Sequence, residues 1–146
     1  MATDGTYANL LASLQQAAET EGVVVEIVAP TVGSTVLSDG KMIAAKQKVN
    51  GGPSVLYDAI AVIPSADGAV LLAREATAKD FVSDAFAHAK FIAYCDDARP
   101  LFSEAGVKEI DGGFVALKGA ADAQSFLKAC GKLRFWEREA KVHAEV

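Results

Sequence analysis

The feature of this sequence that most constrains its fold is the alternation of short apolar runs with segments of helical periodicity. Residues 23–29 (VVVEIVA) and 59–63 (AIAVI) are almost continuously apolar and rich in β-branched side chains, which is typical of strands buried on both faces of a sheet. Before, between and after these runs, apolar residues recur every three or four positions, the spacing of amphipathic helices. Strands that alternate with helices over short links predict a doubly wound α/β domain with a mostly parallel sheet.

The pattern predicts an order of elements along the chain. We expect helices over residues 7–22, 69–89 (as one helix or two), 100–105 and 123–130. We expect strands over residues 23–29, 59–63, 90–94 and 113–117. Asp39-Gly40 lies between the apolar runs 35–37 and 42–44, which predicts a small β-hairpin beside the main sheet.

The beginning of the sequence departs from this pattern. A doubly wound sheet usually opens with a strand of about 5–6 residues, the mean strand length, whereas only a short stretch beginning Met1-Ala2-Thr3-Asp4 precedes the first expected helix. We therefore expect a truncated first strand in a single domain, 1–146, cut from a longer polypeptide. A gap at a central strand would expose backbone groups, so self-association is a further expectation.

Composition excludes several functional classes. The net charge of −5 repels phosphate backbones, and the 14 Lys and Arg residues are scattered, so we expect no nucleic-acid partner. No apolar run approaches the roughly 20 residues that cross a bilayer, and the first residues lack the pattern of a secretory signal. We expect a cytoplasmic protein that does not enter a membrane. The two cysteines, Cys95 and Cys130, have no metal-ligand spacing, and we expect reduced thiols.

Candidate site residues are those that would meet at the carboxyl ends of the strands, where ligands of open α/β sheets bind. They lie in Asp4-Gly5, residues 64–68 and residues 95–97. None of these segments contains a GxGxxG or GxxxxGK[ST] phosphate-binding motif, so we expect no nucleotide cofactor.

Cys95 is the one candidate nucleophile, because it follows an expected strand and precedes a turn, as in a nucleophile elbow. The alternative is a small apolar thiol at the end of a strand. Asp96 and Asp97 favour this second interpretation, since their charges oppose thiolate formation. Neither His88 nor His143 lies in a motif that would supply a base.

The other polar candidates also have simpler interpretations. Asp67, Asp96 and Asp97 could act as paired carboxylates, but aspartates at helix starts are more often caps, so we expect capping roles. Cys130 falls on an apolar helical position and is expected in the core. The tail 134–139 combines charged and aromatic residues, and we expect it to extend the last helix or to dock on a partner.

Several segments, in their order and spacing, resemble a known family. They are residues 24–30, 37–40, 51–59, 79–92, 113–115 and 133–139. Together they resemble the C-terminal flavodoxin-like domain of large-subunit catalases, which is related in fold to the class I glutamine amidotransferase-like superfamily. The resemblance implies that the first strand ends in a Thr-Asp-Gly-like turn, here Thr3-Asp4-Gly5.

The family resemblance also implies what the chain would and would not do. The haem and its ligands would belong to a separate catalase core, so this chain would hold no cofactor and no metal. Its partners would be that core and other subunits. In the related superfamily a cysteine at the elbow is a nucleophile, and Cys95 lies near that position, but the catalase domain is regarded as having lost this chemistry.

Three functions follow as hypotheses. The first is a non-catalytic domain that stabilises a tetrameric haem catalase, an enzyme that disproportionates hydrogen peroxide, and that shapes access to the haem. The second is a chaperone-like holdase for unfolded client proteins. The third is a hydrolase or deglycase that depends on Cys95.

Overall fold

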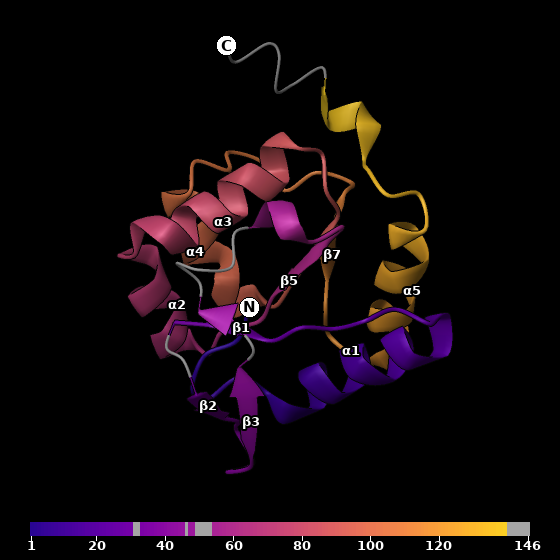
Figure 1. The fold of residues 1–146 in the computed structure, drawn as a ribbon. Coiled ribbons are helices and arrows are strands. Elements are labelled where there is room, and N and C mark those ends of the chain that lie inside the picture. The colour runs from indigo at the N-terminus through magenta and orange to yellow at the C-terminus, as the bar shows by residue number, and fades with distance from the viewer. Residues whose placement is uncertain (31–32, 46, 49–53, 140–146) are drawn as a thin grey trace.

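The computed structural model describes residues 1–30, 33–45, 47–48 and 54–139 (Figure 1). Its helices are α1 (Ala8–Glu21), α2 (Ala66–Ala73), α3 (Ala76–Ala87), α4 (Arg99–Glu104) and α5 (Ala120–Cys130), with short 3-10 helices η1 (Ser54–Leu56), η2 (Asp96–Ala98) and η3 (Trp136–Arg138). Its strands are β1 (Val28–Ala29), β2 (Gly33–Val36), β3 (Met42–Ala45), β4 (Gln47–Lys48), β5 (Ile60–Val62), β6 (Ile92–Tyr94) and β7 (Phe114–Ala116). Strands and helices alternate, which confirms the predicted α/β class.

Met1 and Ala2 join two groups of parallel strands into one sheet. β5, β6 and β7 form one group and β1 with β4 the other. The nitrogen of Met1 donates to the carbonyl of Ala61 at 2.5 Å, and the Ile63 amide donates to the Met1 carbonyl at 3.0 Å, which is the pattern of a parallel strand. The amide of Ala2 donates to the Val28 carbonyl at 2.8 Å. The order β4, β1, Met1–Ala2, β5, β6, β7 contains the flavodoxin-like order.

The strand predicted over residues 23–29 is mostly absent, and that prediction was wrong for all but its last two residues. Only Val28 and Ala29 pair as a strand, while the side chain of Val24 is 85% exposed. A strand needs a neighbour along its whole length. Met1 and Ala2 bond to β1 at Val28, and within the described residues no strand lies beside the β-branched residues before it on that side.

Helices cover both faces of the sheet, as the doubly wound prediction requires (Figure 1). α1 and α5 pack against each other on one face, and α2, α3 and α4 lie on the other. Most of the apolar positions that predicted these helices are buried, among them Leu11 and Leu14 of α1 and Phe126 of α5. None of the helices in the described part of the chain is long and apolar enough to span a membrane.

The hairpin predicted around Asp39-Gly40 is confirmed. β2 and β3 pair in antiparallel register from Gly33 with Ala45 to Val36 with Met42. The hairpin is attached to the carboxyl edge of the sheet, because the Gly5 amide donates to the carbonyl of Val36 at 2.7 Å.

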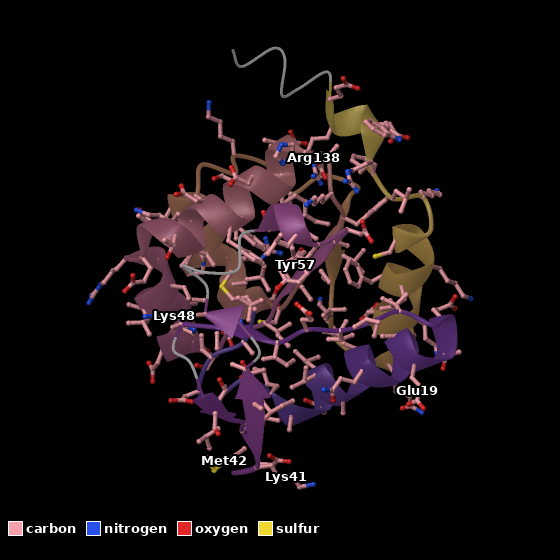
Figure 2. All side chains as sticks on the ribbon, viewed as in Figure 1. Glu19, Lys41, Met42, Lys48, Tyr57 and Arg138 are labelled. Atoms are coloured by element: carbon pink, nitrogen blue, oxygen red, sulfur yellow. The ribbon has the colours of Figure 1, made fainter. Side chains whose placement is uncertain are left out.

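The C-terminal segment turns back onto its own domain instead of extending α5. Leu133 has a φ of 66°, a left-handed conformation that redirects the chain after the helix. The chain then reaches Arg138, whose side chain is fully buried and bonds to the Asp111 carboxylate at 2.6 and 2.9 Å (Figure 2). The tail predicted to extend the helix or to dock on a partner therefore docks on this chain.

Candidate functional site at the carboxyl ends of the strands

The candidate site lies where the strand order reverses, between Met1–Ala2 and β5. In open sheets of this order, ligands bind in the crevice beyond the strand ends at that point. The structure brings the predicted segments together there, since Ser65 bonds directly to the residues around Asp4 and Cys95 bonds to the Pro64 carbonyl. The crevice is therefore built from the residues that the sequence indicated.

A network of hydroxyl groups links the segments at these strand ends. The amide of Ser65 donates to Oγ1 of Thr3 at 3.0 Å, and Oγ of Ser65 donates to the Asp4 carbonyl at 2.6 Å. Oγ of Ser65 also accepts from the Gly68 amide at 3.1 Å and thereby caps α2. Free amides at the start of a helix can bind an anion. At the start of α2, one of these amides already donates a hydrogen bond to Oγ of Ser65.

Thr6 forms the second half of the network and is fully buried. Its Oγ1 donates to the Ile63 carbonyl at 2.7 Å and accepts from the Thr3 amide at 3.0 Å. The packing is tight, because a Cβ atom added to Gly68 would lie 1.9 Å from Oγ1 of Thr3. Sequence reasoning placed Thr3 in the turn after the first strand but assigned neither threonine to the site. Their only signal was their position on either side of the Asp4-Gly5 turn.

The Asp4-Gly5 turn itself is also engaged. Oδ1 of Asp4 accepts from the amide of Val36 at 3.0 Å, so its carboxylate holds the hairpin over the strand ends. Gly5 has a φ of 84°, which favours glycine, and an added Cβ would lie 3.0 Å from Cβ of Ser65. The Asp4-Gly5 turn therefore holds the β2–β3 hairpin against the sheet.

Cys95 is buried and bonded within the protein. Its side chain is 5% exposed, and Sγ donates to the Pro64 carbonyl at 3.3 Å. Burial raises the pKa of the Cys95 thiol above its usual range, and the nearby carboxylate of Asp97 raises it further. A catalytic cysteine acts as the thiolate, which this environment disfavours.

The other candidate residues are separated from Cys95 or have different roles. His88 ends α3 just before β6, whereas Cys95 follows β6, so the two lie at opposite ends of one strand. His143 lies outside the described residues. Asp96 forms an exposed ion pair with Arg99 at 3.4 Å.

The capping roles predicted for three aspartates were wrong. Ser65 caps α2, while Asp67 lies in its first turn. Asp96 and Asp97 lie in the first turn of η2, which has no side-chain cap. The prediction failed because each aspartate lies one or two residues inside its helix, where its side chain is past the cap position.

The comparison with protein families decides the identity of the domain. The family described as the C-terminal domain found in long catalases matches residues 1–140. This chain belongs to that family.

Relatives of this catalase C-terminal domain are themselves catalases. Catalase C of Rhizobium meliloti (strain 1021) is 50% identical over 143 residues, which are 97% of this chain and 20% of the relative. Catalase-B of Dictyostelium discoideum is 30% identical over 131 residues, 85% of this chain and 18% of the relative. Catalase HPII of Pseudomonas putida is 28% identical over 145 residues, 99% of this chain and 20% of the relative. The chain thus spans about a fifth of these relatives.

Solved structures of similar fold include DJ-1 proteins. DJ-1beta of Drosophila melanogaster superposes with a TM-score of 0.74 at 14% identity, covering 99% of this chain and 93% of that one. DJ-1 of Schizosaccharomyces pombe gives a TM-score of 0.72 at 12% identity, covering 99% and 95%. The likeness confirms the predicted flavodoxin-like, amidotransferase-like architecture of the catalase C-terminal domain.

The haem that a catalase requires does not fit the described residues of this domain. A cavity of about 740 Å³ includes Tyr57 and Cys130 in its lining, and each type of side chain can ligate haem iron. Burial raises the pKa of Tyr57 to about 12 and that of Cys130 to about 11, so both would have to ionise against their surroundings. No group of His, Cys, Asp and Glu residues suited to a metal ion occurs within the described ranges. Cys130, expected in the core, is only partly buried at this cavity.

Proposed function

We propose that this chain is the C-terminal domain of a longer haem catalase, an enzyme that disproportionates hydrogen peroxide. In this proposal the domain supplies stability, and the chemistry belongs to the catalase core. Membership of the catalase C-terminal family supports the first part. The observation that carries the second part is the hydrogen-bond network at the strand ends, in which Thr3, Thr6 and Ser65 bond to one another and to the backbone.

The domain would stabilise the enzyme by burial of apolar surface against the core and other subunits of a tetramer. Apolar area removed from water contributes about 25 cal/mol per Å², less the cost of association. Exposed apolar side chains are available for such contacts, including Val70 and Leu71 on α2 and Trp136 in η3. We further propose that docking at the core limits access to the haem.

A Cys95-dependent hydrolase is the less favoured function. Its nucleophile would be a buried thiol with a raised pKa, 3.3 Å from a carbonyl to which it donates. The proposal also places the protein in the cytoplasm, where Cys95 and Cys130, both free thiols in the structure, would stay reduced.

The test uses Catalase C of Rhizobium meliloti, the 50% identical relative. Three enzymes are compared: the intact catalase, the catalase with the matching segment deleted, and a chimera in which this chain replaces that segment. We expect deletion to lower the temperature of thermal inactivation, the chimera to restore it, and kcat per haem at 25 °C to stay the same. Equal inactivation temperatures for all three would contradict a stabilising role.

The haem-access part has a separate readout. Deletion should raise the rate at which cyanide, a small haem ligand, binds to the enzyme, and the chimera should lower it again. Unchanged cyanide binding rates would contradict the access role while leaving the stabilising role to the thermal experiment.

A further inference from the structure

The chain contains four sulfur atoms, in Met1, Met42, Cys95 and Cys130, and all four residues lie in the described part of the structure. Peroxides oxidise both kinds of side chain: a cysteine reacts as its thiolate, and a methionine reacts as the thioether itself. Which sulfur reacts first therefore depends on exposure and, for the cysteines, on the pKa of the thiol. The four positions differ widely in these properties.

Three of the four sulfur atoms are shielded from a reagent in solution. Met1 is 8% exposed, and Cys95 is buried as described above. Cys130 is partly buried, and burial raises its pKa to about 11. With that pKa, fewer than about one Cys130 thiol in a thousand is ionised at pH 7.5. Neither cysteine is therefore a good target for peroxide in the folded domain.

Met42 is the exception. Its side chain is 69% exposed, and it projects from the start of β3 away from the body of the domain (Figure 2). Met42 lies opposite Val36 of β2, which is itself 41% exposed. The next pair along the hairpin, Thr35 and Ile43, turns toward the domain instead, as the alternation of side chains in a strand requires. Met42 thus belongs to the outer face of the hairpin, in contact with solvent.

Backbone contacts hold this hairpin in place. The amide of Leu37 donates to the carbonyl of Lys41 at 2.8 Å and closes the turn. The amide of Val36 donates to the Asp4 carboxylate at 3.0 Å and attaches the hairpin to the strand ends. The Met42 sulfur takes part in neither contact. An oxygen atom added to this sulfur would therefore enter water and leave the hydrogen bonds of the hairpin unchanged.

We propose that Met42 is a site of reversible oxidation by hydrogen peroxide, at which the domain accepts an oxygen atom without losing its fold. A lone pair of the sulfur attacks one peroxide oxygen, the O–O bond breaks and an S–O bond forms. The proton of the attacked oxygen moves to the departing hydroxide, so the products are methionine sulfoxide and water. Methionine sulfoxide reductases reverse the oxidation, with two thiols oxidised to a disulfide and water released.

Oxidation makes the outer face of the hairpin more polar. The sulfoxide oxygen accepts hydrogen bonds from water, beside the half-exposed Val36. Any apolar surface that covers this face would have to remove that water, which is unfavourable. The site rests on the exposure of Met42 and not on the catalase role. Hydrogen peroxide is, however, the substrate of the proposed parent enzyme, so the domain would meet this oxidant.

The test treats the 146-residue chain with hydrogen peroxide and follows the mass gain of about 16 Da in each sulfur-containing peptide. We expect the Met42 peptide to gain one oxygen at least about tenfold faster than the peptides that carry the other sulfur atoms. The Met42 rate should be equal at pH 6.5 and pH 8.5, because a thioether has no proton to lose. Uptake that is fastest at a cysteine, or equal at all four sulfur atoms, would overturn the proposal.

A matched pair of variants separates exposure from the presence of a methionine. Met42→Leu should abolish the fast oxygen uptake. Leu72→Met, added to Met42→Leu, moves the methionine to a fully buried position of α2, and its oxidation should be at least about tenfold slower than that of Met42. Circular dichroism before oxidation establishes that both variants are folded. A buried methionine that is oxidised as fast as Met42 would refute the argument from exposure.

The oxidised chain tests whether the change is reversible and leaves the fold intact. Its melting temperature should differ by less than about 2 °C from that of the reduced chain, as for a surface substitution. Methionine sulfoxide reductases should remove the added oxygen from the folded chain. A larger fall in melting temperature, or a sulfoxide that the reductases do not reduce, would contradict the proposal.

The chimera with Catalase C of Rhizobium meliloti tests the site in a longer enzyme. With its haem blocked by cyanide, so that added peroxide persists, the Met42 peptide should gain oxygen at a rate within about threefold of that in the 146-residue chain. Protection of Met42 in the chimera would overturn the site for the longer enzyme. That outcome would leave the thermal test of the proposed function unaffected, so the two failures are distinguishable.

Discussion

Replacement of Arg138 should destabilise the domain more than replacement of any exposed charged residue. Arg138 is fully buried, and its guanidinium bonds to both oxygens of the Asp111 carboxylate at 2.6 and 2.9 Å. It also donates to the carbonyl of Lys90 at 2.8 Å and lies 4.6 Å from the ring centre of Phe86. The substitution Arg138→Met keeps much of the apolar stem but removes all of these charged contacts.

The expected loss follows from what the substitution leaves behind. The Asp111 side chain is only 6% exposed, so Arg138→Met leaves a buried carboxylate without its cation. The contacts that remain to the Asp111 carboxylate include a hydrogen bond from the Gly113 amide at 2.8 Å. Removal of one partner from a buried ion pair destabilises a protein by about 3–5 kcal/mol. At about 2–4 °C per kcal/mol for a domain of this size, the melting temperature should fall by roughly 10 °C.

Urea unfolding followed by circular dichroism measures this loss, with Arg74→Met as the control. Arg74 is exposed at the end of α2, and its replacement should change the free energy of unfolding by less than about 0.5 kcal/mol. The double variant Arg138→Met, Asp111→Asn removes both charges and should recover part of the loss, because no unpaired buried charge remains. A loss in Arg138→Met no larger than that in Arg74→Met would refute the reasoning.

Three further predictions concern the two edges of the sheet. Gly68→Ala places a methyl group against Thr3 and should destabilise the domain by about 1–3 kcal/mol in urea unfolding, while Gly119→Ala, which adds a methyl group in open space, should cost less than half as much. Cys95 should react with iodoacetamide at pH 7.5 at least about tenfold more slowly than a free model thiol, and a rate equal to the model thiol would contradict its burial. The free energy of unfolding should fall as the pH rises from 9 to 11, because the unfolded Cys130 thiol ionises near 9.0 while the folded thiol keeps its proton up to about 11. Cys130→Ala should flatten that slope in unfolding curves measured at each pH, and an unchanged slope would contradict the raised pKa.

Local sequence patterns correctly predicted the elements that depend on adjacent residues or on one buried face. The apolar spacing of α1 placed its buried face correctly, and Gly22, with a φ of 69°, ends the helix where the sequence indicated. The Asp39-Gly40 pair located the hairpin for the same reason, since a turn depends on a few adjacent residues.

The pattern failed where the outcome depended on distant residues. Residues 23–27 have the composition of a strand, but a strand forms only beside a neighbour, and sequence composition does not report the neighbour's length. Arg138 is a charged residue near the end of the chain, and its sequence position alone suggests that it is exposed. It is buried because Asp111, 27 residues earlier, lies at the place where the chain returns. The roles of Thr3 and Thr6 likewise depend on Ser65 and Ile63, about sixty residues away in sequence.

The carboxyl edge of the sheet leaves few polar groups free for a ligand. At the carboxyl edge, the groups that a catalytic site would leave available are bonded within the chain: the start of α2 to Ser65, the Cys95 thiol to the Pro64 carbonyl, and the Asp4 carboxylate to the hairpin. Each such bond contributes to folding and removes a contact that a substrate would need. The fold thus retains the architecture of a ligand-binding α/β domain, while the polar groups at its strand ends hold the domain together.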